Sequence, residues 1–329
     1  MKANLFFCLL YAILQLIAGI PVLRAQNTPA TAQAAILAPG IISGPVDDAA
    51  PAFTPDGKTV YFHRRSSSLG PVIMVSHWRQ GKWSEPVVAP FSGQWSDIEP
   101  TMAPDGSYLI FASNRPAIAG GKPLDGTWNR KTWPEHGGNL WRVDWQGDHF
   151  GEPYRLPDII NSSSSTFSPS IAADGSLYFM QPVGEKSKFH IYRAAFHNGQ
   201  YEKPEWVSFS AADTISDFDP AVAPDESFLI FGSGRPTSTR GRLFIVYRKD
   251  GQWGEPVPLG DEVNQPTASP NEARLSPDHR TLYFSSAYQP PATYPATPAE
   301  TRERLRQSQW FTESNNIWFI SLDSYIPAR

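Results

Sequence analysis

The sequence predicts an all-β fold, a five-bladed β-propeller, and three observations lead to this prediction. The 329 residues include 32 prolines, 24 glycines and 13% aromatic residues, a composition that favours many short strands joined by tight turns. A motif recurs five times along the chain, and a strand-like segment near the N-terminus supplies the piece that the last repeat lacks. We therefore expect one propeller domain over residues 36–329, although length alone would suggest two domains.

The repeat consists of a Pro-Asp-Gly-like turn followed by an aliphatic and aromatic run that ends in phenylalanine. Its aspartate falls at positions 56, 105, 174, 225 and 278, so successive copies are 49, 69, 51 and 53 residues apart. Periods of about this length are typical of propeller blades, in which each repeat forms a four-stranded sheet. The turn segments are residues 51–57, 100–106, 169–175, 220–226 and 273–279.

Each repeat can be divided into four strands, A to D. Strand A enters the turn, whose Pro-Asp-Gly chemistry suits a tight reversal, and strand B is the run that ends in phenylalanine. A glycine turn and an aromatic–proline segment end the first four repeats, and we expect the outer strand D there because an edge strand tolerates proline. Strand C is predicted at residues 73–75, 140–143, 191–192, 243–246 and 317–320.

The fifth repeat has no strand D of its own, since the sequence ends at Arg329. The apolar residues 36–43 resemble the run at 155–161 that closes the second repeat. We expect residues 36–39 to form strand D of the last blade, which removes the open edge of the ring. Six blades are the alternative, but no stretch of the chain is left over to build a sixth.

The first 25 residues have the features of a secretory signal peptide. Lys2 precedes an apolar run over residues 5–20, and a cleavage site is expected after Ala25. The alternative is an uncleaved membrane anchor, but the run is short for a span and lacks a charged flank. Residues 26–35 are expected to form a flexible leader. We therefore expect a periplasmic or secreted protein, with no membrane span after cleavage.

Cleavage after Ala25 would also remove Cys8, which is the only cysteine. The mature chain could then form neither a disulfide nor a thiolate metal site. Its net charge would change from −4 to −6, because Lys2 and Arg24 are lost while 26 basic and 32 acidic residues remain. This mildly acidic balance offers no positive surface for nucleic acid or anionic lipid, so no nucleic-acid partner is expected.

The repeated turn, together with Phe-Ala-Ser-Asn-Arg at residues 111–115, resembles the PD40 or WD40-like β-propeller repeat. The propeller of TolB-like proteins is built from this repeat. The resemblance covers about residues 45–329 and is specific for fold more than for function. It implies a propeller without the additional N-terminal α/β domain of TolB, for which the sequence has no room, so it implies none of TolB's partners.

Two long inserts between strands B and C indicate where a ligand could bind. One spans residues 115–139 in the second repeat, and the other spans residues 287–315 in the fifth. Within the latter, Thr-Pro-Ala-Glu at 297–300 has the pattern of a capped helix start and predicts a short helix over about 298–309. In a propeller the loops between strands B and C lie on one face, which we call the top. The second and fifth repeats both neighbour the first in a five-membered ring, so we expect the two inserts to flank the top of blade 1.

The candidate ligand-binding residues come from these inserts and from the end of strand B in the first repeat. The insert tryptophans could stack on a sugar or a peptide side chain, or could pack the loop against the propeller. The histidines could instead be hydrogen-bonding residues of a loop or the core, and the inserts could only shield an edge or an apolar patch. The candidates are His63, Arg64, Arg65, Arg115, Trp128, Trp133, His136 and Trp310.

A second candidate site consists of the acidic residues just before the strand A prolines. Glu99, Asp219 and Glu272 occupy this position in three repeats, with Ala50 and Ser168 in the other two. If the three acids point into the mouth of the central channel, they form an acidic ring. Such a ring could hold a Ca²⁺ ion, or could supply the acid and base of glycoside hydrolysis.

The alternative for the acidic residues is structural. Acids at repeated positions, which also include a second set two residues earlier, could pair with the arginines that end strand B and tie loops together. The second set is Asp48, Asp97 and Asp217, and the arginines are Arg65, Arg115 and Arg235.

Searches for other catalytic motifs find none. The sequence contains no HExxH helix, GxSxG elbow, phosphate loop or dinucleotide fingerprint, and its seven histidines show no metal-ligand spacing. No cofactor is expected, with a Ca²⁺ ion in the channel as the one exception. The leading hypothesis is an exported recognition module that binds a protein, peptide or glycan at its top face near blade 1. The alternative is a carbohydrate-active hydrolase that uses the channel-mouth carboxylates.

Overall fold

The structure, a computed structural model, describes residues 33–66, 68, 70–182, 188–210, 214–235, 242–265, 267–289, 294–309 and 314–327. The predicted signal peptide, most of the predicted leader, and Trp310 lie outside the described residues. The unit that contains residues 33–329 is the one described below. Within its described part, no helix has the length and apolar character needed to cross a membrane.

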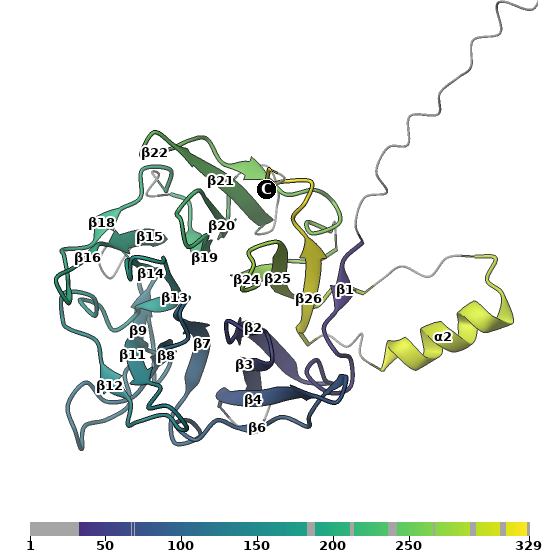
Figure 1. The fold of residues 1–329 in the computed structure, drawn as a ribbon, viewed down its shortest axis with the longest axis horizontal. Coiled ribbons are helices and arrows are strands. Elements are labelled where there is room, and N and C mark those ends of the chain that lie inside the picture. The colour runs from purple at the N-terminus through teal and green to yellow at the C-terminus, as the bar shows by residue number, and fades with distance from the viewer. Residues whose placement is uncertain are drawn as a thin grey trace, which may run out of the picture. The chain divides into compact units, whose positions relative to one another are not determined.

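Five antiparallel sheets form the blades of a five-bladed β-propeller, which confirms the predicted fold (Figure 1). The A strands contact one another around the centre, and strands B, C and D follow outward. Blades 1 and 2 are β2 (Asp47–Phe53), β3 (Thr59–Arg65), β4 (Val72–Arg79) and β6 (Val87–Val88), then β7 (Asp97–Met102), β8 (Tyr108–Ser113), β11 (Asn139–Asp144) and β12 (Tyr154–Arg155). Blades 3 and 4 are β13 (Phe167–Ile171), β14 (Leu177–Pro182), β15 (Phe189–Ala194) and β18 (Glu205–Trp206), then β19 (Asp217–Val222), β20 (Phe228–Ser233), β21 (Arg242–Lys249) and β23 (Val257–Pro258).

The fifth blade is closed by the N-terminal segment, as predicted. It contains β24 (Asn271–Leu275), β25 (Thr281–Ser286), β26 (Asn316–Ser321) and, as its outer strand, β1 (Ala35–Ile36). Ala35 and Ile36 pair with Phe319 and Trp318 of β26, and the Leu37 N–H donates to the Ile317 carbonyl at 2.8 Å. The strand thus begins one residue earlier than expected and ends at Ile36 instead of residue 39. This pairing excludes the six-bladed alternative.

The outer strands lie just beyond the aromatic–proline segments and not on them. In blade 1 the aromatic residue belongs to β5 (Lys82–Trp83), which folds back on the end of β4, with Trp83 paired to Trp78. In blade 4, β22 (Gln252–Trp253) folds back on the end of β21 in the same way. In blade 3, β16 (Phe196–His197) and β17 (Gln200–Tyr201) form a separate small hairpin. The aromatic residue therefore lies in the returning strand of a short hairpin, and strand D begins after the proline.

Apolar residues of strands B and C form the core between the blades. The described residues contain five apolar clusters, and each joins two neighbouring blades. The phenylalanine that ends the strand B motif is buried in all five blades, at Phe62, Phe111, Phe179, Phe231 and Phe284. Burying each ring contributes roughly 1.5–3 kcal/mol, which explains why the motif repeats.

The turn between strands A and B needs a positive φ at its glycine position, and two blades meet this need without glycine. Gly57, Gly106 and Gly175 have φ of 67°, 75° and 85°, whereas Glu226 and His279 adopt 55° and 59°. L-residues favour this left-handed conformation much less than glycine does. The two substituted turns belong to blades 4 and 5.

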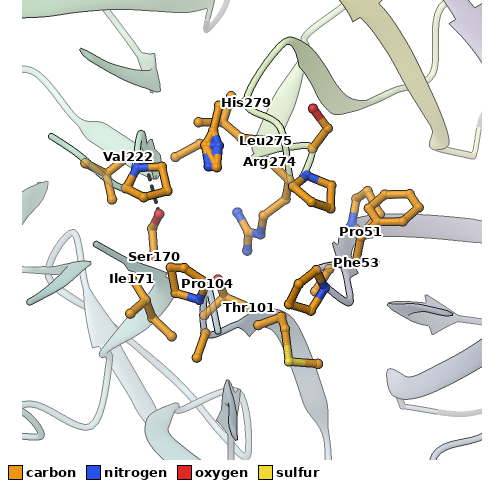
Figure 2. Close-up of a pocket in the computed structure, with 18 residues that line it drawn as sticks. Pro51, Phe53, Thr101, Pro104, Ser170, Ile171, Val222, Arg274, Leu275 and His279 are labelled. Atoms are coloured by element: carbon orange, nitrogen blue, oxygen red, sulfur yellow. Dashed lines mark hydrogen bonds between the residues drawn. The ribbon is translucent and has the colours of Figure 1, made fainter. Parts of the chain in front are cut away.

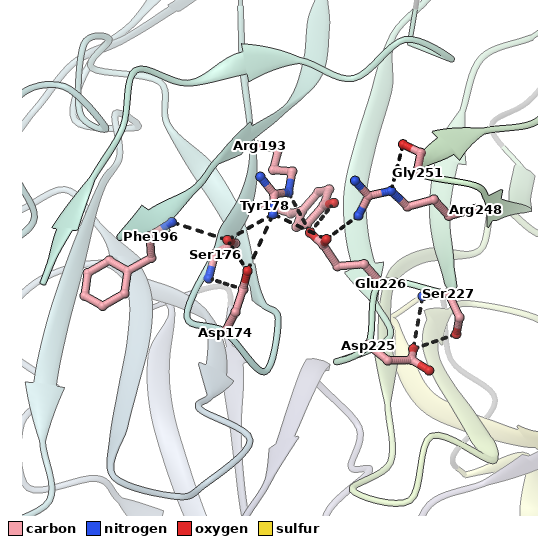
Figure 3. Close-up of polar contacts among 10 residues, drawn as sticks. All are labelled: Asp174, Ser176, Tyr178, Arg193, Phe196, Asp225, Glu226, Ser227, Arg248 and Gly251. Carbon is pink, nitrogen blue, oxygen red and sulfur yellow. Dashed lines mark hydrogen bonds and ion pairs between the residues drawn. The ribbon is translucent and has the colours of Figure 1, made fainter. Parts of the chain in front are cut away.

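Glu226 compensates for its backbone conformation with side-chain contacts that join blades 3 and 4 (Figure 3). Its carboxylate accepts hydrogen bonds from Tyr178 Oη at 2.7 Å and Arg193 Nε at 2.6 Å, and it also contacts Arg248. Burial would raise the pKa of Glu226, but the hydrogen bonds from Arg193 and Tyr178 lower it below its ordinary value. Glu226 is thus an ionised carboxylate that holds two arginines together.

Candidate functional site

The insert of blade 2 contains a β-hairpin that carries two of the predicted tryptophans. Its strands are β9 (Gly126–Trp128) and β10 (Lys131–Trp133). Both residues between them have positive φ, 51° and 63°, as a two-residue type I′ turn requires. The rings of Trp128 and Trp133 stack with their centroids 5.5 Å apart, and Lys131 Nζ lies 3.6 Å from the Trp133 centroid. The hairpin therefore presents a rigid aromatic pair.

This insert packs against blade 3. Thr127 N–H donates to Ser165 Oγ at 2.8 Å, and the Trp128 ring lies 5.6 Å from Phe189 and 6.2 Å from Phe167. A Cβ at Gly138 would lie only 2.2 Å from the Phe167 ring, so the close approach of the insert requires glycine there. The sequence predicts inserts that flank blade 1, whereas the apolar Phe167 and Phe189 draw this one towards blade 3.

The insert of blade 5 contains the predicted helix, α2 (Pro298–Ser308). Thr297 and Glu300 form the expected capping box, in which Thr297 N–H donates to Glu300 Oε2 at 2.7 Å and Glu300 N–H donates to Thr297 Oγ1 at 3.2 Å. Its described side chains are exposed or half-exposed, and Figure 1 shows α2 beyond β1 on the outer side of the ring. The helix is confirmed, but it does not line the pocket described next.

A pocket of about 660 Å³ opens between blades 1, 2 and 3 at the end where the B–C loops lie, and we call it the upper pocket. Its volume falls within the range of roughly 300–1,000 Å³ that is usual for ligand sites. One wall is apolar and comes mainly from blade 3 and the insert; it contains Trp128, Phe167, Met180 and Phe189. The polar lining includes Arg65, Ser96, Glu99, Asn114, Glu135 and His136.

Hydrogen bonds fix the polar side of the upper pocket. Asn114 Oδ1 accepts from Ser96 N–H at 2.9 Å, and its Nδ2 donates to the Glu135 carbonyl at 2.9 Å. Asn114 therefore ties the insert to the loop before β7. His136 is exposed at the rim, with Nδ1 2.6 Å from the Pro134 carbonyl oxygen, and Arg65 is also exposed. Arg65 and His136 thus form part of the exposed polar rim of the upper pocket.

The acids of the second candidate site come together inside the channel. Each belongs to a β-bulge in strand A, and the five equivalent residues all have φ between 50° and 55°: Ala50, Glu99, Ser168, Asp219 and Glu272. A non-glycine residue at positive φ is uncommon, and repetition at one position in every blade shows that the bulge is a fixed part of the repeat.

Four of these bulge residues, together with His63 of β3, form a closed ring of polar contacts through all five blades, which we call the channel ring (His63, Glu99, Ser168, Asp219 and Glu272). Glu99 Oε2 accepts from Ser168 N–H at 2.7 Å, and Ser168 Oγ donates to Asp219 Oδ1 at 2.6 Å. Asp219 Oδ2 accepts from Glu272 N–H at 2.9 Å, and Glu272 Oε1 lies 3.8 Å from His63 Nε2. His63 Nδ1 accepts from Glu99 N–H at 3.2 Å and completes the circuit.

Burial controls the ionisation of the channel ring. It raises the pKa of Glu99 to about 7 and that of Glu272 to about 8, and the charge of Asp219 adds to both shifts while Arg274 opposes them. Burial, with Arg65 and Arg274 nearby, lowers the pKa of His63 to about 3. His63 is therefore neutral, and because Nδ1 accepts a hydrogen bond, its proton is on Nε2.

The second set of acids, the outer acids, pairs with arginines as the structural alternative predicts. Asp48 lies 2.6 Å from Arg64, Asp97 lies 2.7 Å from Arg115, and Asp217 lies 2.6 Å from Arg235. In blade 1 the partner is Arg64 and not the expected Arg65, because Asp48 is directly opposite Arg64 in the strand pairing. Arg65 is left to line the upper pocket.

The structure therefore divides the predicted ligand-binding residues. Arg65, Trp128 and His136 line the upper pocket, and Trp133 stacks on Trp128. The others lie elsewhere: His63 is in the channel ring, Arg64 and Arg115 are in ion pairs, and Trp310 is outside the described residues.

Sequence reasoning missed Phe167 and Phe189. They are the first residues of β13 and β15, and an aromatic residue at a strand end was the available signal. In the part of the chain that the structure describes, no three or more His, Asp or Glu side chains are arranged to hold a metal ion.

Comparisons with known proteins find resemblance only among solved structures. No protein-family model matches the chain, and no curated protein matches it. It is similar to the putative TolB from Agrobacterium tumefaciens, with 17% identity over 74% of this chain and 70% of that one and a TM-score of 0.45. It is also similar to TolB from Acinetobacter baumannii, with 20% identity over 64% of this chain and 43% of that one and a TM-score of 0.41. A third similar structure is the Hadza microbial sialidase Hz136, with 15% identity over 73% of this chain and 53% of that one and a TM-score of 0.45.

The chain thus spans less than half of the Acinetobacter protein and about half of the sialidase. Two of these similar structures are TolB proteins, while the finer PD40 assignment stays a prediction because no family model matches. None of these likenesses assigns an activity or a partner to this chain.

Proposed function

We propose that this protein is a recognition module that binds a peptide segment of a partner protein in the upper pocket. The observation that carries the proposal is the pocket of about 660 Å³, with an apolar wall on one side and charged groups at its rim. An aliphatic or aromatic side chain of the ligand packs against Trp128 and Phe189, and Arg65 pairs with a carboxylate or carbonyl oxygen. Aromatic anchors in a pocket with a polar rim are typical of peptide recognition.

We also propose that the module acts outside the cytoplasm, in the periplasm or the extracellular medium. The support is the signal-peptide pattern of residues 1–25. Export of a reporter fused after residue 35, lost when residues 5–20 are interrupted by charges, tests this proposal. A reporter that stays in the cytoplasm contradicts it.

The binding proposal is tested by titrating the protein with peptides that carry aromatic or aliphatic residues, and with oligosaccharides as a comparison panel. A bound peptide raises the melting midpoint, with stabilisation of about 2.7 kcal/mol at 100 times its Kd. Trp128→Ala weakens peptide binding tenfold or more, because it removes an aromatic ring of the apolar wall that contacts both Phe167 and Phe189. Trp78→Ala, which removes a tryptophan that is 44% exposed and does not line the pocket, leaves binding unchanged.

Two outcomes contradict the peptide proposal. Equal loss of binding in both tryptophan variants shows that the upper pocket is not the site. If an oligosaccharide binds and no peptide does, the ligand of the upper pocket is a glycan and not a peptide.

A second candidate function, glycan hydrolysis, is favoured by one observation. Glu99 lines the upper pocket and has a pKa of about 7, so it can donate a proton near neutral pH, as a general acid does. Product analysis with the same oligosaccharides tests this function, and Glu99→Gln abolishes any cleavage if Glu99 is the acid. Absence of products from the unmodified protein excludes hydrolysis of those sugars.

A further inference from the structure

The lower half of the channel contains one large charged side chain where the other blades have small ones. The equivalent strand A positions are occupied by Ala52, Thr101, Ser170, Ala221 and Arg274. Arg274 is only 4% exposed. Its Nη1 donates to the Ala273 carbonyl at 2.7 Å, and its Nε lies 3.5 Å from the Pro100 carbonyl oxygen of blade 2. Because blades 5 and 2 are not neighbours, the side chain crosses the channel.

The remaining nitrogen of the guanidinium group, Nη2, is buried and has no hydrogen-bond partner in the described part of the chain. Buried polar groups of proteins are nearly always hydrogen-bonded, since an unmet donor carries the cost of its lost hydration. Arginine also keeps its charge in proteins, so it cannot avoid this cost by losing a proton. The Nη2 atom therefore indicates a missing acceptor.

Arg274 lines a cavity of about 130 Å³ at the end of the channel formed by the A–B turns (Figure 2). Figure 2 shows the guanidinium group within a circle of strand A residues, including Thr101 and Ser170. Ser170 Oγ accepts a hydrogen bond from Val222 N–H at 3.0 Å, so its own proton can be donated to another group. Thr101 adds a second hydroxyl to the lining.

The charges of the lining select an anion. No carboxylate is among the residues that line the cavity, which include Arg274, His279 and hydroxyl side chains. The acids of the channel ring are absent from this lining, although the charge of Arg274 acts on Glu99 and Glu272. The cavity is well below the roughly 300–1,000 Å³ of ordinary ligand pockets, so its occupant is small.

We propose that this lower cavity binds a small oxyanion, with one oxygen on Arg274 Nη2 and others on the hydroxyls of Ser170 and Thr101. Guanidinium groups bind carboxylate and phosphate oxygens through charge-assisted hydrogen bonds. An oxyanion would supply the hydrogen-bond acceptor that Arg274 Nη2 lacks among the described residues. The site is separate from the upper pocket and does not depend on the function proposed for that pocket.

The test is calorimetric titration of the purified protein with sodium phosphate, sulfate and acetate at constant ionic strength, together with melting curves in the same solutions. We expect saturable binding of one anion per chain and a rise in the melting midpoint. Phosphate or sulfate binding assigns an inorganic oxyanion, and acetate binding alone assigns a carboxylate. No saturable binding of any of the three overturns the proposal.

Variants locate the site. Arg274→Met reduces anion affinity tenfold or more, whereas Arg79→Met, which removes an exposed arginine at the end of β4, leaves it unchanged. Equal affinity in Arg274→Met, or loss in Arg79→Met, overturns the proposal. If Arg274→Met does not fold, Ser170→Ala keeps the charge and removes one donor; severalfold weaker binding supports the site and unchanged binding overturns it.

Discussion

The outer acids and the acids of the channel ring differ in their partners although they lie only two residues apart in the same strands. Asp97 and Asp217 each contact an arginine that ends strand B of their own blade. Glu99 and Asp219 instead accept hydrogen bonds from the backbone or side chain of residues in neighbouring blades. The outer acids therefore fasten loops within a blade, and the channel ring joins one blade to the next.

The difference between the two sets shows that the partner, and not burial alone, decides what a buried acid does. Burial raises the pKa of Asp97 and of Glu99 alike. The positive charge of Arg115 opposes this shift at Asp97, whereas at Glu99 the neighbouring Asp219 adds to it. An arginine thus opposes the raised pKa of each outer acid, whereas Asp219 adds to the raised pKa of Glu99 and of Glu272 in the channel ring.

Arg115→Ala is expected to give the largest effect, because it leaves Asp97 buried without its cation. Arg115 also donates to the Phe91 carbonyl at 2.6 Å, and this contact is lost as well. Breaking one side of a buried ion pair costs about 3–5 kcal/mol. Urea unfolding of the variant measures the loss.

The matched control for Arg115→Ala is Arg142→Ala. Arg142 pairs with Asp144 at 2.6 Å, but the two side chains are 24% and 41% exposed. Exposed pairs contribute roughly 0.2–1 kcal/mol, so the control loses much less stability. Similar losses in both variants would show that Asp97 does not depend on its arginine.

Ser168→Ala tests the channel ring with a smaller effect. It removes the hydroxyl that donates to Asp219 Oδ1 at 2.6 Å and leaves that oxygen without this donor. The expected cost is about 1–3 kcal/mol. Ala50 already adopts a φ of 50° at the equivalent position of blade 1, so the backbone tolerates alanine there. A neutral result in urea unfolding would mean that the ring is not continuous.

Among these variants, Glu272→Gln is expected to change the free energy of unfolding least near pH 5. At higher pH we expect the variant to be more stable than the unmodified protein. The folded-state pKa of Glu272, about 8, lies above the ordinary value of 4.5, so the folded protein binds more protons between these values. Its stability therefore falls as pH rises through this window and levels off above it. Glutamine does not ionise, so the variant lacks this part of the decline.

The measurement for Glu272→Gln is the free energy of unfolding from about pH 5 to about pH 9 in both proteins. Glu135→Gln, at an exposed position, serves as the control and leaves the pH profile unchanged. Parallel profiles of the unmodified protein and Glu272→Gln would contradict the raised pKa.

Much of the fold could be predicted because its determinants repeat along the chain. The spacing of the turn aspartates and the strand B phenylalanines gave five blades, and the missing last strand identified the closing segment. The capped helix was also predicted correctly, since a capping box depends on residues three apart. The two acid sets could be found by aligning the repeats, and so could Arg115 and Arg235 as partners of the outer acids, but the contacts of the channel ring could not.

The candidate site was only partly predicted because its contacts depend on distant segments. Arg65 and Arg64 are adjacent in sequence, and only the register of β2 with β3 decides which one meets Asp48. Phe167 and Phe189 join the upper pocket because the insert of blade 2 leans on blade 3. Arg274 stands out in the aligned repeats, yet its crossing of the channel towards Pro100 is visible only in the folded ring.

The sequence by itself determined the number of blades, the strand that closes the ring and the positions of the acids, because these follow from local periodicity and turn chemistry. Only the tertiary structure decided which arginine meets Asp48, which blade the insert of blade 2 covers and which guanidinium nitrogen of Arg274 lacks a partner. These outcomes depend on contacts between side chains from different blades. Because these side chains are buried, each hydrogen bond or ion pair that is gained or lost changes the free energy more than it would in water.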